Sequence, residues 1–306
     1  MRIVIALGGN ALLRNGEKQT YFTLINNIKK TVKYLVPLIK EHKVVCTTGN
    51  GPQVGFILLQ NEIAKKKIPP MPLDVLGAES QGLIGYPLEE QLVNGLRHTK
   101  KDVATILTQV LVDKSDPAFH NPTKFVGPFY TYSQAQKLKY KYKIKKDSNR
   151  GYRRVVPSPR PLKILEIKII KKLLRNNITI IAAAGGGIPV IEENGKLKGV
   201  EAVIDKDLAS ACLANSIKAD LLIMITSVPY AYLNFGTRQQ TPLKKISLDE
   251  ARDYYMQDHF PPGSMGPKIE AAINFLDKKG KKVVITNPEN LMKALNDKSG
   301  TIITKR

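Results

Sequence analysis

The chain has 306 residues, of which 48 are lysine or arginine and 26 are aspartate or glutamate, so its formal net charge is +22 at pH 7. It has no run of about 18 apolar residues that would span a membrane, and two cysteines, Cys46 and Cys212, are too few for a disulfide scaffold. We therefore expect a cytoplasmic protein with reduced thiols. We attribute the charge to scattered surface lysines and expect no nucleic-acid partner, because specific readers of nucleic acid favour arginine.

Predicted strands and helices alternate along the chain. The first strand, 3–7, is a continuous aliphatic run, and apolar residues from Phe22 to Leu35 then recur at helical spacing. Pro37 is expected to end or kink that helix. Further strands are predicted at 44–47, 103–111, 178–183, 221–226, 283–286 and 301–304, and further helices at 54–64, 89–97, 166–175, 208–215, 248–255 and 269–278.

Apolar strands separated by amphipathic helices are typical of a mainly parallel sheet covered on both faces. The sequence therefore predicts an α/β fold, a three-layer αβα sandwich. One polar, basic segment, about 128–160, interrupts the pattern and is expected to leave the main sheet. Alternating lysines at 137–145 favour a strand there, although 133–139 could also form a short helix.

Three predicted strands end in glycine-rich turns, at 8–11, 49–55 and 185–187. In open α/β sheets, ligands bind beyond the carboxyl ends of the strands. Glycine lets the backbone approach a ligand closely, and the amides of such turns suit a phosphate. We therefore predict an anion site at this edge, the alternative being that the glycines serve only tight turns. The Walker phosphate loop, the protein-kinase signatures and the dinucleotide fingerprint are all absent.

Three lysines stand in contexts unlike those of the scattered ones. Lys124 follows Asn-Pro-Thr, Lys206 lies between Asp205 and Asp207, and Lys268 follows a Pro- and Gly-rich turn before a predicted helix. Phosphoryl transfer needs positioned positive charge more than a base. The alternative is that each is one surface lysine among many. The four histidines have no metal-ligand spacing, so no protein-built metal site is predicted.

Six motifs resemble those of the carbamate kinases, within the amino-acid kinase superfamily, and together they span nearly the whole chain. They are ALGGNA (6–11), GNGPQVG (49–55), DPAFHNPTK (116–124), NRGYRRVVPSP (149–159), GVEAVIDKD (199–207) and HFPPGSMGPKIEAA (259–272). The first two are shared across the superfamily, whereas the middle and last ones are more specific. Thr48 and Glu79 depart from the pattern, since many relatives have histidine and methionine there.

The resemblance implies the amino-acid kinase fold in one domain, with an acyl-phosphate lobe at about 1–215 and a nucleotide lobe at about 216–306. The segment at about 128–160 would be a protruding subdomain over the acyl-phosphate site. The resemblance also implies a homodimer that needs Mg²⁺ and transfers a phosphoryl group reversibly between carbamoyl phosphate plus ADP and carbamate plus ATP. The ATP-forming direction, in arginine catabolism through the arginine deiminase pathway, is expected.

Site residues also follow from the resemblance. Catalytic roles are implied for Asn10, Asn50, Lys124, Lys206, Asp207 and Lys268. Contacts to carbamoyl phosphate are implied for Gly8, Gly9, Gly49, Gly51, Gly186 and Arg153, and contacts to the nucleotide for Ser227, Phe235, Gly236, Met265 and Gly266.

Two rival functions stay open. One is another kinase of the superfamily, acting on an amino-acid carboxylate or a phosphonate-type acceptor. The other is a nucleic-acid-binding protein that reuses the fold, supported only by the charge and by the Lys-Tyr alternation near 137–146.

Overall fold

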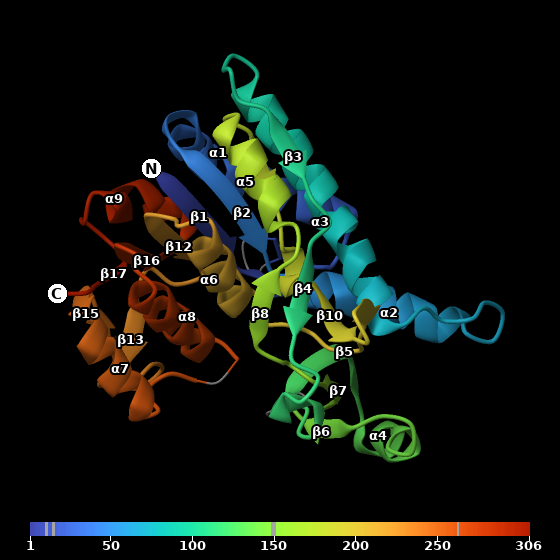
Figure 1. Ribbon diagram of the computed structural model, residues 1–306. Helices are drawn as coiled ribbons and strands as arrows, with labels where there is room; N and C mark the ends of the chain where they lie inside the picture. The colour runs from blue at the N-terminus through green and yellow to red at the C-terminus, as the bar shows by residue number, and fades with distance from the viewer. Residues whose placement is uncertain (10–11, 14–15, 148–150, 262) are drawn as a thin grey trace.

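The computed structural model of the protein describes residues 1–9, 12–13, 16–147, 151–261 and 263–306. Its centre is an eight-stranded sheet in the order β15-β17-β16-β12-β1-β2-β9-β3 (Figure 1). The strands from β16 to β3 in this order are parallel, whereas β17 is antiparallel to β16. The strands are β1 (Arg2–Leu7), β2 (Lys43–Thr48), β3 (Val103–Thr105), β9 (Thr179–Ile181), β12 (Leu221–Ile225), β15 (Lys245–Ser247), β16 (Lys282–Thr286) and β17 (Thr301–Thr304).

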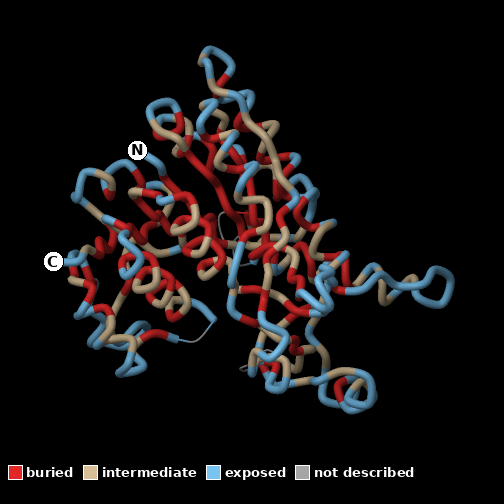
Figure 2. The backbone as a smooth tube through the Cα atoms, in the orientation of Figure 1, coloured by how far each residue is buried: buried red, intermediate tan, exposed pale blue. Residues whose placement is uncertain are grey.

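Helices cover both faces of this sheet. The helices are α1 (Tyr21–Glu41), α2 (Gly51–Ala64), α3 (Leu73–Leu96), α4 (Tyr132–Leu138), α5 (Ile167–Arg175), α6 (Lys206–Ser216), α7 (Leu248–Met256), α8 (Met265–Asp277) and α9 (Leu291–Leu295), with short 3₁₀ turns at Pro117–Phe119, Ala184–Gly186 and Pro288–Asn290. On β1, Ile3, Ile5 and Leu7 pack with α1 and α3, and Val4 and Ala6 pack with α6 and α8 on the other face. Figure 2 shows buried backbone concentrated along the central strands. The predicted mainly parallel sheet with two covered faces is confirmed.

Two smaller sheets lie beside the main one. The first has the order β11-β10-β4-β8 and the second has the order β5-β7-β6, which together with α4 forms the lower part of Figure 1. A separate two-stranded ribbon pairs β13 with β14. Their strands are β4 (Gln109–Val112), β5 (Lys124–Tyr130), β6 (Ile144–Lys146), β7 (Tyr152–Val156), β8 (Pro161–Ile164), β10 (Ile188–Glu193), β11 (Lys196–Gly199), β13 (Ala231–Leu233) and β14 (Thr241–Leu243).

Several predicted elements differ from the observed ones. Helix α1 does not end at Pro37 but continues to Glu41. Proline has no N–H, so the Lys33 carbonyl loses its helical hydrogen-bond partner. Lys33 and Pro37 are both exposed, and water can hydrate that carbonyl instead. The buried side chains of Leu38 and Ile39 hold the last turn of the helix against the core. The single strand predicted at 103–111 is two strands in different sheets, β3 and β4.

Two further elements differ from their predicted bounds. Helix α3 starts sixteen residues before the predicted 89–97 helix and contains Pro87. In the basic segment the short-helix alternative at 133–139 is confirmed, since 132–138 is helical, whereas the alternating run 137–145 is a strand only from 144 onward. None of the described helices is both long enough and apolar enough to cross a membrane. The boundary between two lobes near residue 215 stays a prediction.

Candidate functional site

The glycine-rich turns meet at the carboxyl ends of β1, β2 and β9. Their backbones continue the sheet pairing, because Gly8 N–H donates to the Ile225 carbonyl and Gly49 N–H donates to the Leu7 carbonyl, each at 2.9 Å. All three turns line one cleft of about 300 Å³. The cleft is lined by Gly8, Gly9, Gly49, Asn50, Gly51, Gly185, Lys124, Asp205, Lys206, Asp207, Thr226, Ser227, Ser264 and Lys268, among others.

The start of α6 brings charged side chains to this cleft. Asp205 is the N-cap residue, and its Oδ1 accepts a hydrogen bond of 2.9 Å from the Asp207 N–H. A carboxylate at this position is favourable because it satisfies a free amide and faces the positive end of the helix dipole. The cap therefore holds Lys206 and Asp207 in the first turn of the helix, beside the glycine turns.

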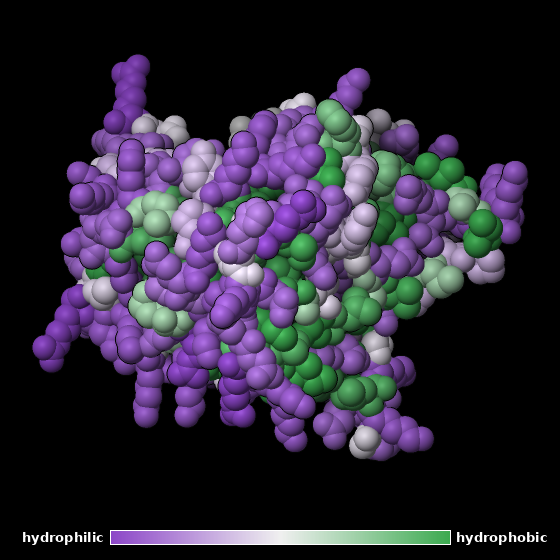
Figure 3. Space-filling view, turned by 90° about the horizontal axis from the view of Figure 1, so that it is seen from above, coloured by the Kyte–Doolittle hydropathy of each residue, from purple (hydrophilic) through white to green (hydrophobic). Residues whose placement is uncertain are grey.

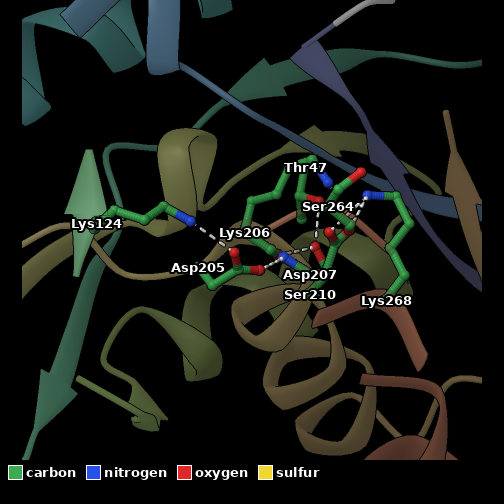
Figure 4. A network of polar contacts seen from close by, with 8 residues as sticks. All are labelled: Thr47, Lys124, Asp205, Lys206, Asp207, Ser210, Ser264 and Lys268. Carbon is green, nitrogen blue, oxygen red and sulfur yellow. Dashed lines mark hydrogen bonds and ion pairs between the residues drawn. The ribbon is translucent and has the colours of Figure 1, made fainter. Parts of the chain in front are cut away.

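One buried carboxylate joins two lysines from different helices. Lys206 Nζ donates to Asp207 Oδ1 at 2.5 Å, and Lys268 Nζ, from α8, donates to Asp207 Oδ2 at 3.1 Å (Figure 4). Asp207 is 3% exposed and Lys268 is 7% exposed. Lys268 also donates to the Ser264 carbonyl at 3.3 Å. Two ammonium groups share one carboxylate, so this group of three keeps a net positive charge next to the cleft.

A second ion pair joins the cleft from β5. Lys124 Nζ donates to Asp205 Oδ2 at 2.7 Å, from the opposite side of Asp205 to Lys206 (Figure 4). With Lys124, Lys206 and Lys268 set against Asp205 and Asp207, the five groups carry a net charge of +1. The arrangement suits an anion that already brings negative charge into the cleft.

Neutral side chains form hydrogen bonds next to the lysines and aspartates of the cleft. Ser210 Oγ donates to the Lys206 carbonyl at 2.6 Å, and the hydroxyls of Thr47 and Ser210 share a hydrogen bond of 2.5 Å. These contacts connect the first turn of α6 to β2. Asn50 Nδ2 donates to Ser80 Oγ at 2.7 Å. A Cβ at Gly185 would lie 2.1 Å from Asn50 Nδ2, so only glycine leaves room for that side chain.

Burial and ion pairing set the titration of the shared carboxylate. Burial would raise the pKa of Asp207, but Lys206 and Lys268 outweigh burial and hold this pKa at about 2, below its ordinary value of 3.8. Burial and the neighbouring Lys268 lower the pKa of Lys206, and Asp207 offsets only part of that effect. Asp207 is therefore an anion at every physiological pH.

Comparison with known proteins identifies the family. Residues 1–287 match the amino acid kinase family. The chain is 49% identical over 310 residues to the carbamate kinase of Pyrococcus horikoshii, with 99% of each chain covered, and 46% identical to that of Halobacterium salinarum, with 98% and 97% covered. The solved structure of carbamate kinase from Giardia lamblia bound to AMP-PNP has a TM-score of 0.93 at 44% identity and covers 100% of this chain and 98% of its own. The chain belongs to the carbamate kinases of the amino acid kinase family.

This membership confirms the family and the fold predicted from the motifs, and it makes the chain a kinase. It does not test the assigned residues, whose roles stay predictions. The identity of 45–49% to carbamate kinases over nearly the whole chain argues against the rival hypothesis of a nucleic-acid-binding protein that only reuses the fold.

Most of the predicted site residues that the structure describes lie together. Among the residues predicted to be catalytic, Asn50, Lys124, Lys206, Asp207 and Lys268 line the cleft. Gly8, Gly9, Gly49, Gly51 and Ser227 line it too. Asn10 lies outside the described residues. Met265 and Gly266 occupy the first turn of α8, between the cleft residues Ser264 and Lys268.

Met265 and Gly266 do not themselves line the cleft, and four other predicted residues lie outside it as well. Gly186 packs behind it, where glycine is required because φ is +90° and any Cβ would lie 2.3 Å from the Ile204 carbonyl oxygen. Arg153 donates to the Gly127 carbonyl and to Asp147, each at 3.1 Å. Phe235 is 56% exposed next to Gly236 in the β13–β14 connection. Any role of these four residues in binding stays a prediction.

Sequence reasoning misses three parts of the site. The Asp-Lys-Asp order suggests that Asp205 holds Lys206, but the ion pair of Asp205 is with Lys124. The sequence assigns Ser80 no role, because it lacks the strand-turn context of a nucleophile elbow, yet its hydroxyl accepts a hydrogen bond from Asn50 Nδ2. Gly185 lines the cleft in place of Gly186. The Asp-Lys-Asp spacing signals an N-cap, but nothing in the sequence signals the role of Ser80, because its contact depends on how α3 crosses α2.

The described residues contain no group of three or more His, Cys, Asp or Glu side chains that could hold a metal ion. Both carboxylates at the cleft are engaged by lysines. Mg²⁺ in phosphoryl-transfer sites often takes few protein carboxylates and several ligands from phosphates and water. The cleft residues that the structure describes therefore offer a metal ion no carboxylate free of a lysine, and a Mg²⁺ bound there would take its ligands from phosphates and water.

The depressed pKa of Asp207 makes stability depend on acid pH. A carboxyl whose folded pKa is about 2 and whose ordinary value is 3.8 stabilises the fold above pH 3.8, and this contribution is lost as the pH falls toward 2. We expect the difference in unfolding free energy between the native chain and Asp207→Asn to shrink by ~2 kcal/mol over that window. Denaturant unfolding at a series of pH values measures it. A difference that stays constant would contradict the assigned ion pairing.

Proposed function

We propose that the protein transfers a phosphoryl group reversibly between carbamoyl phosphate plus ADP and carbamate plus ATP. The observation that carries this proposal is the convergence of three ammonium groups and three glycine-rich turns on one cleft. The names of the relatives at 45–49% identity over nearly the whole chain support the choice of carbamate as acceptor.

The chemistry needs positioned charge and no general base. In the ATP-forming direction, the bond between phosphorus and the carbamoyl oxygen breaks, and an oxygen of the ADP β-phosphate forms the new bond to phosphorus. Carbamate leaves as an anion and ADP attacks as one, so no proton has to move. Negative charge spreads over the transferring group, and preorganised cations stabilise it at little reorganisation cost.

Each part of the cleft has a proposed task. The amides of Gly9 and Gly51 hold the acyl phosphate, as amides of such turns hold phosphates elsewhere. Gly8 and Gly49, whose own amides pair with the sheet, let the backbone approach the acyl phosphate closely. Lys206 and Lys268 act on the phosphoryl from the nucleotide side, and Asp207 keeps them oriented. Lys124 approaches from β5. When bound with the nucleotide, Mg²⁺ supplies further neutralisation of phosphate charge.

The proposal extends to setting and direction. Carbamate decomposes to ammonia and CO₂, which draws the reaction toward ATP and suits a catabolic role, here the breakdown of arginine through the arginine deiminase pathway. The small number of cysteines and their free thiols agree with a cytoplasmic location.

The activity is tested with the purified chain. We expect ATP to form from carbamoyl phosphate and ADP in the presence of Mg²⁺, and ATP formation to stop when a chelator removes the ion. Coupled ATP detection measures both. Acetylglutamate and aspartate, offered with ATP, serve as alternative acceptors. Phosphorylation of either of them without turnover of carbamoyl phosphate would assign the chain to another kinase activity of its superfamily.

The two lysines on Asp207 should dominate turnover. We expect Lys206→Ala and Lys268→Ala each to lower kcat at least about a hundredfold, the scale for removing one preorganised transition-state donor. Each variant leaves Asp207 one partner, so folding should persist. Lys139→Ala and Lys244→Ala remove exposed lysines elsewhere and serve as matched controls. Near-native kcat in both site variants, with intact folding by circular dichroism, would refute the roles.

We also propose a homodimer, assembled through the apolar side chains that α1, α2 and α3 leave exposed. Phe22, Phe56 and Tyr86 are 73%, 42% and 65% exposed. An apolar hollow of about 350 Å³ lies next to them, lined in part by Leu24, Phe56 and Leu83. Exposed apolar patches of this kind mark protein–protein contacts.

Light scattering tests the assembly. We expect a mass twice the 34.0 kDa of the chain. Tyr86→Lys places a charge among the exposed apolar groups and should give a monomer with unchanged circular dichroism. A monomeric native chain, or a Tyr86→Lys variant that dimerises normally, would contradict this surface.

A further inference from the structure

A second hollow lies at the opposite edge of the main sheet from the cleft. It has a volume of about 680 Å³ and is lined at the amino ends of the strands, by Arg2 at the start of β1, Lys43 at the start of β2 and Lys101 before β3. The carboxyl ends of β1 and β2, together with that of their neighbour β9, carry the glycine turns. Figure 3 looks down on this upper end of the molecule and shows hydrophilic residues over much of it.

The lining of this hollow is strongly cationic. Its charged members are Arg2, Lys43, Lys101, Lys171, Arg175 and Lys218 against Glu41 and Asp220. Six cations and two carboxylates leave a formal charge of +4. We call the space between them the basic hollow. Asp220 is already occupied, because it accepts from Lys281 Nζ at 2.6 Å and from the Arg2 N–H at 2.9 Å.

Three of these cations contact backbone carbonyls at the C-terminal ends of helices. Lys101 Nζ donates to the His42 carbonyl at 2.8 Å, and Arg2 NH1 donates to the Ile217 carbonyl at 2.9 Å. Lys43 Nζ lies 3.4 Å from the Arg175 carbonyl. These carbonyls follow or end α1, α6 and α5, where free C=O groups attract cations.

Those contacts position the cations without neutralising them. The acceptors are carbonyl dipoles, and within the described chain none of the six cationic side chains forms an ion pair with a carboxylate. Lys101 also donates to the Asn177 amide oxygen at 2.7 Å, which is again a neutral partner. The basic hollow therefore differs from the cleft, where each carboxylate is matched to a lysine.

The local titration agrees with crowded positive charge. Burial lowers the pKa of Lys101, and the nearby Lys43 lowers it further. His42, which also lines the hollow, keeps a buried Nδ1 without a hydrogen-bond partner among the described residues. A bound anion would relieve the repulsion between Lys43 and Lys101 that the protein itself does not compensate.

We propose that the basic hollow is a binding site for a small anion that carries two or more phosphate groups. Six cations spread around about 680 Å³ exceed what one phosphate can neutralise, whereas a short polyphosphate can reach several of them. Four of the six cations are lysines, which bind phosphate as point charges rather than by the planar fork that reads nucleic-acid bases. The site is separate from the cleft and does not depend on the reaction proposed there.

Inorganic tripolyphosphate is the probe, titrated into the full chain by calorimetry at about 0.15 M salt, where weak surface attraction is screened.

The double variant Lys43→Met with Lys101→Met removes two ammonium groups and keeps the length of the side chains. Lys171→Met with Lys218→Met removes two ammonium groups that make no hydrogen bond within the described chain, so folding should be unaffected. Lys139→Met with Lys244→Met is the control of equal charge change on other surfaces.

The ring signals of His42 in nuclear magnetic resonance spectra, assigned with His42→Gln, report on the basic hollow alone. We expect both hollow variants to bind tripolyphosphate at least about tenfold more weakly, the scale of one lost charge-assisted contact. The control should bind like the native chain, and the His42 signals should move on titration. Native-like binding by both hollow variants with unmoved His42 signals would overturn the proposal and leave binding to the cleft.

A short DNA duplex tests the macromolecular alternative in the same assay. We expect it to bind more weakly than tripolyphosphate at about 0.15 M salt, because non-specific attraction to a duplex falls steeply with salt. A duplex that binds more tightly than tripolyphosphate, and is lost in both hollow variants, would make this surface a nucleic-acid site and overturn the proposal.

Discussion

The architecture of the cleft depends on one carboxylate that is shared by two ammonium groups. Asp207 accepts from Lys206 on its own helix and from Lys268 on α8, so it holds two helices and two charges in a fixed relation. Its desolvation is unfavourable, and it is offset because both lysines are close and hydrogen-bonded. A lone buried carboxylate could not keep its charge there, and two lysines without it would repel each other. The excess of one positive charge remains available to a ligand.

The glycine turns bring backbone amides close to this positive charge. The amides of Gly8 and Gly49 continue the hydrogen bonding of the sheet into the turns. The amides that follow them in the turns are therefore held in place by the same sheet that forms the core. Gly49 brings the backbone next to the Lys206 side chain, since a Cβ there would lie 3.3 Å from Lys206 Cδ. Amides and ammonium groups thus reach one small volume from two different elements. Amides supply direction and no net charge, whereas the lysines supply charge with less direction, and phosphoryl transfer needs both.

What the sequence can predict follows from the range of each interaction. Strand periodicity, glycine turns and the Asp-Lys-Asp cap are local, and the sheet and most cleft residues are predictable from them. The pairing of Lys124 with Asp205 is not, because it joins residues 81 positions apart through the packing of β5. Of the two outcomes expected at Pro37, an end of α1 is wrong, because local steric rules ignore the buried residues Leu38 and Ile39 that follow it, and a kink stays a prediction. The division of 103–111 into β3 and β4 depends on which sheet each half pairs with, and side-chain alternation carries no information on that.

The two edges of the main sheet differ in the sign of the partial charge that their helix ends present. At the carboxyl edge, helices α2 and α6 present their N-termini and glycine turns present amides, so the backbone itself is positive there, and acidic residues are placed among the lysines to limit the excess. At the amino edge, the ends of α1, α5 and α6 present carbonyls, and cations gather on them. A carbonyl carries only a fraction of a charge, so three of them together with Glu41 and Asp220 do not balance six cations. The lysines at the carboxyl edge are paired with carboxylates, whereas the cations at the amino edge are not. The chain has 48 lysines and arginines against 26 acidic residues, so most of its cations have no carboxylate partner. An anion bound at the amino edge, as proposed above, would balance the charge there.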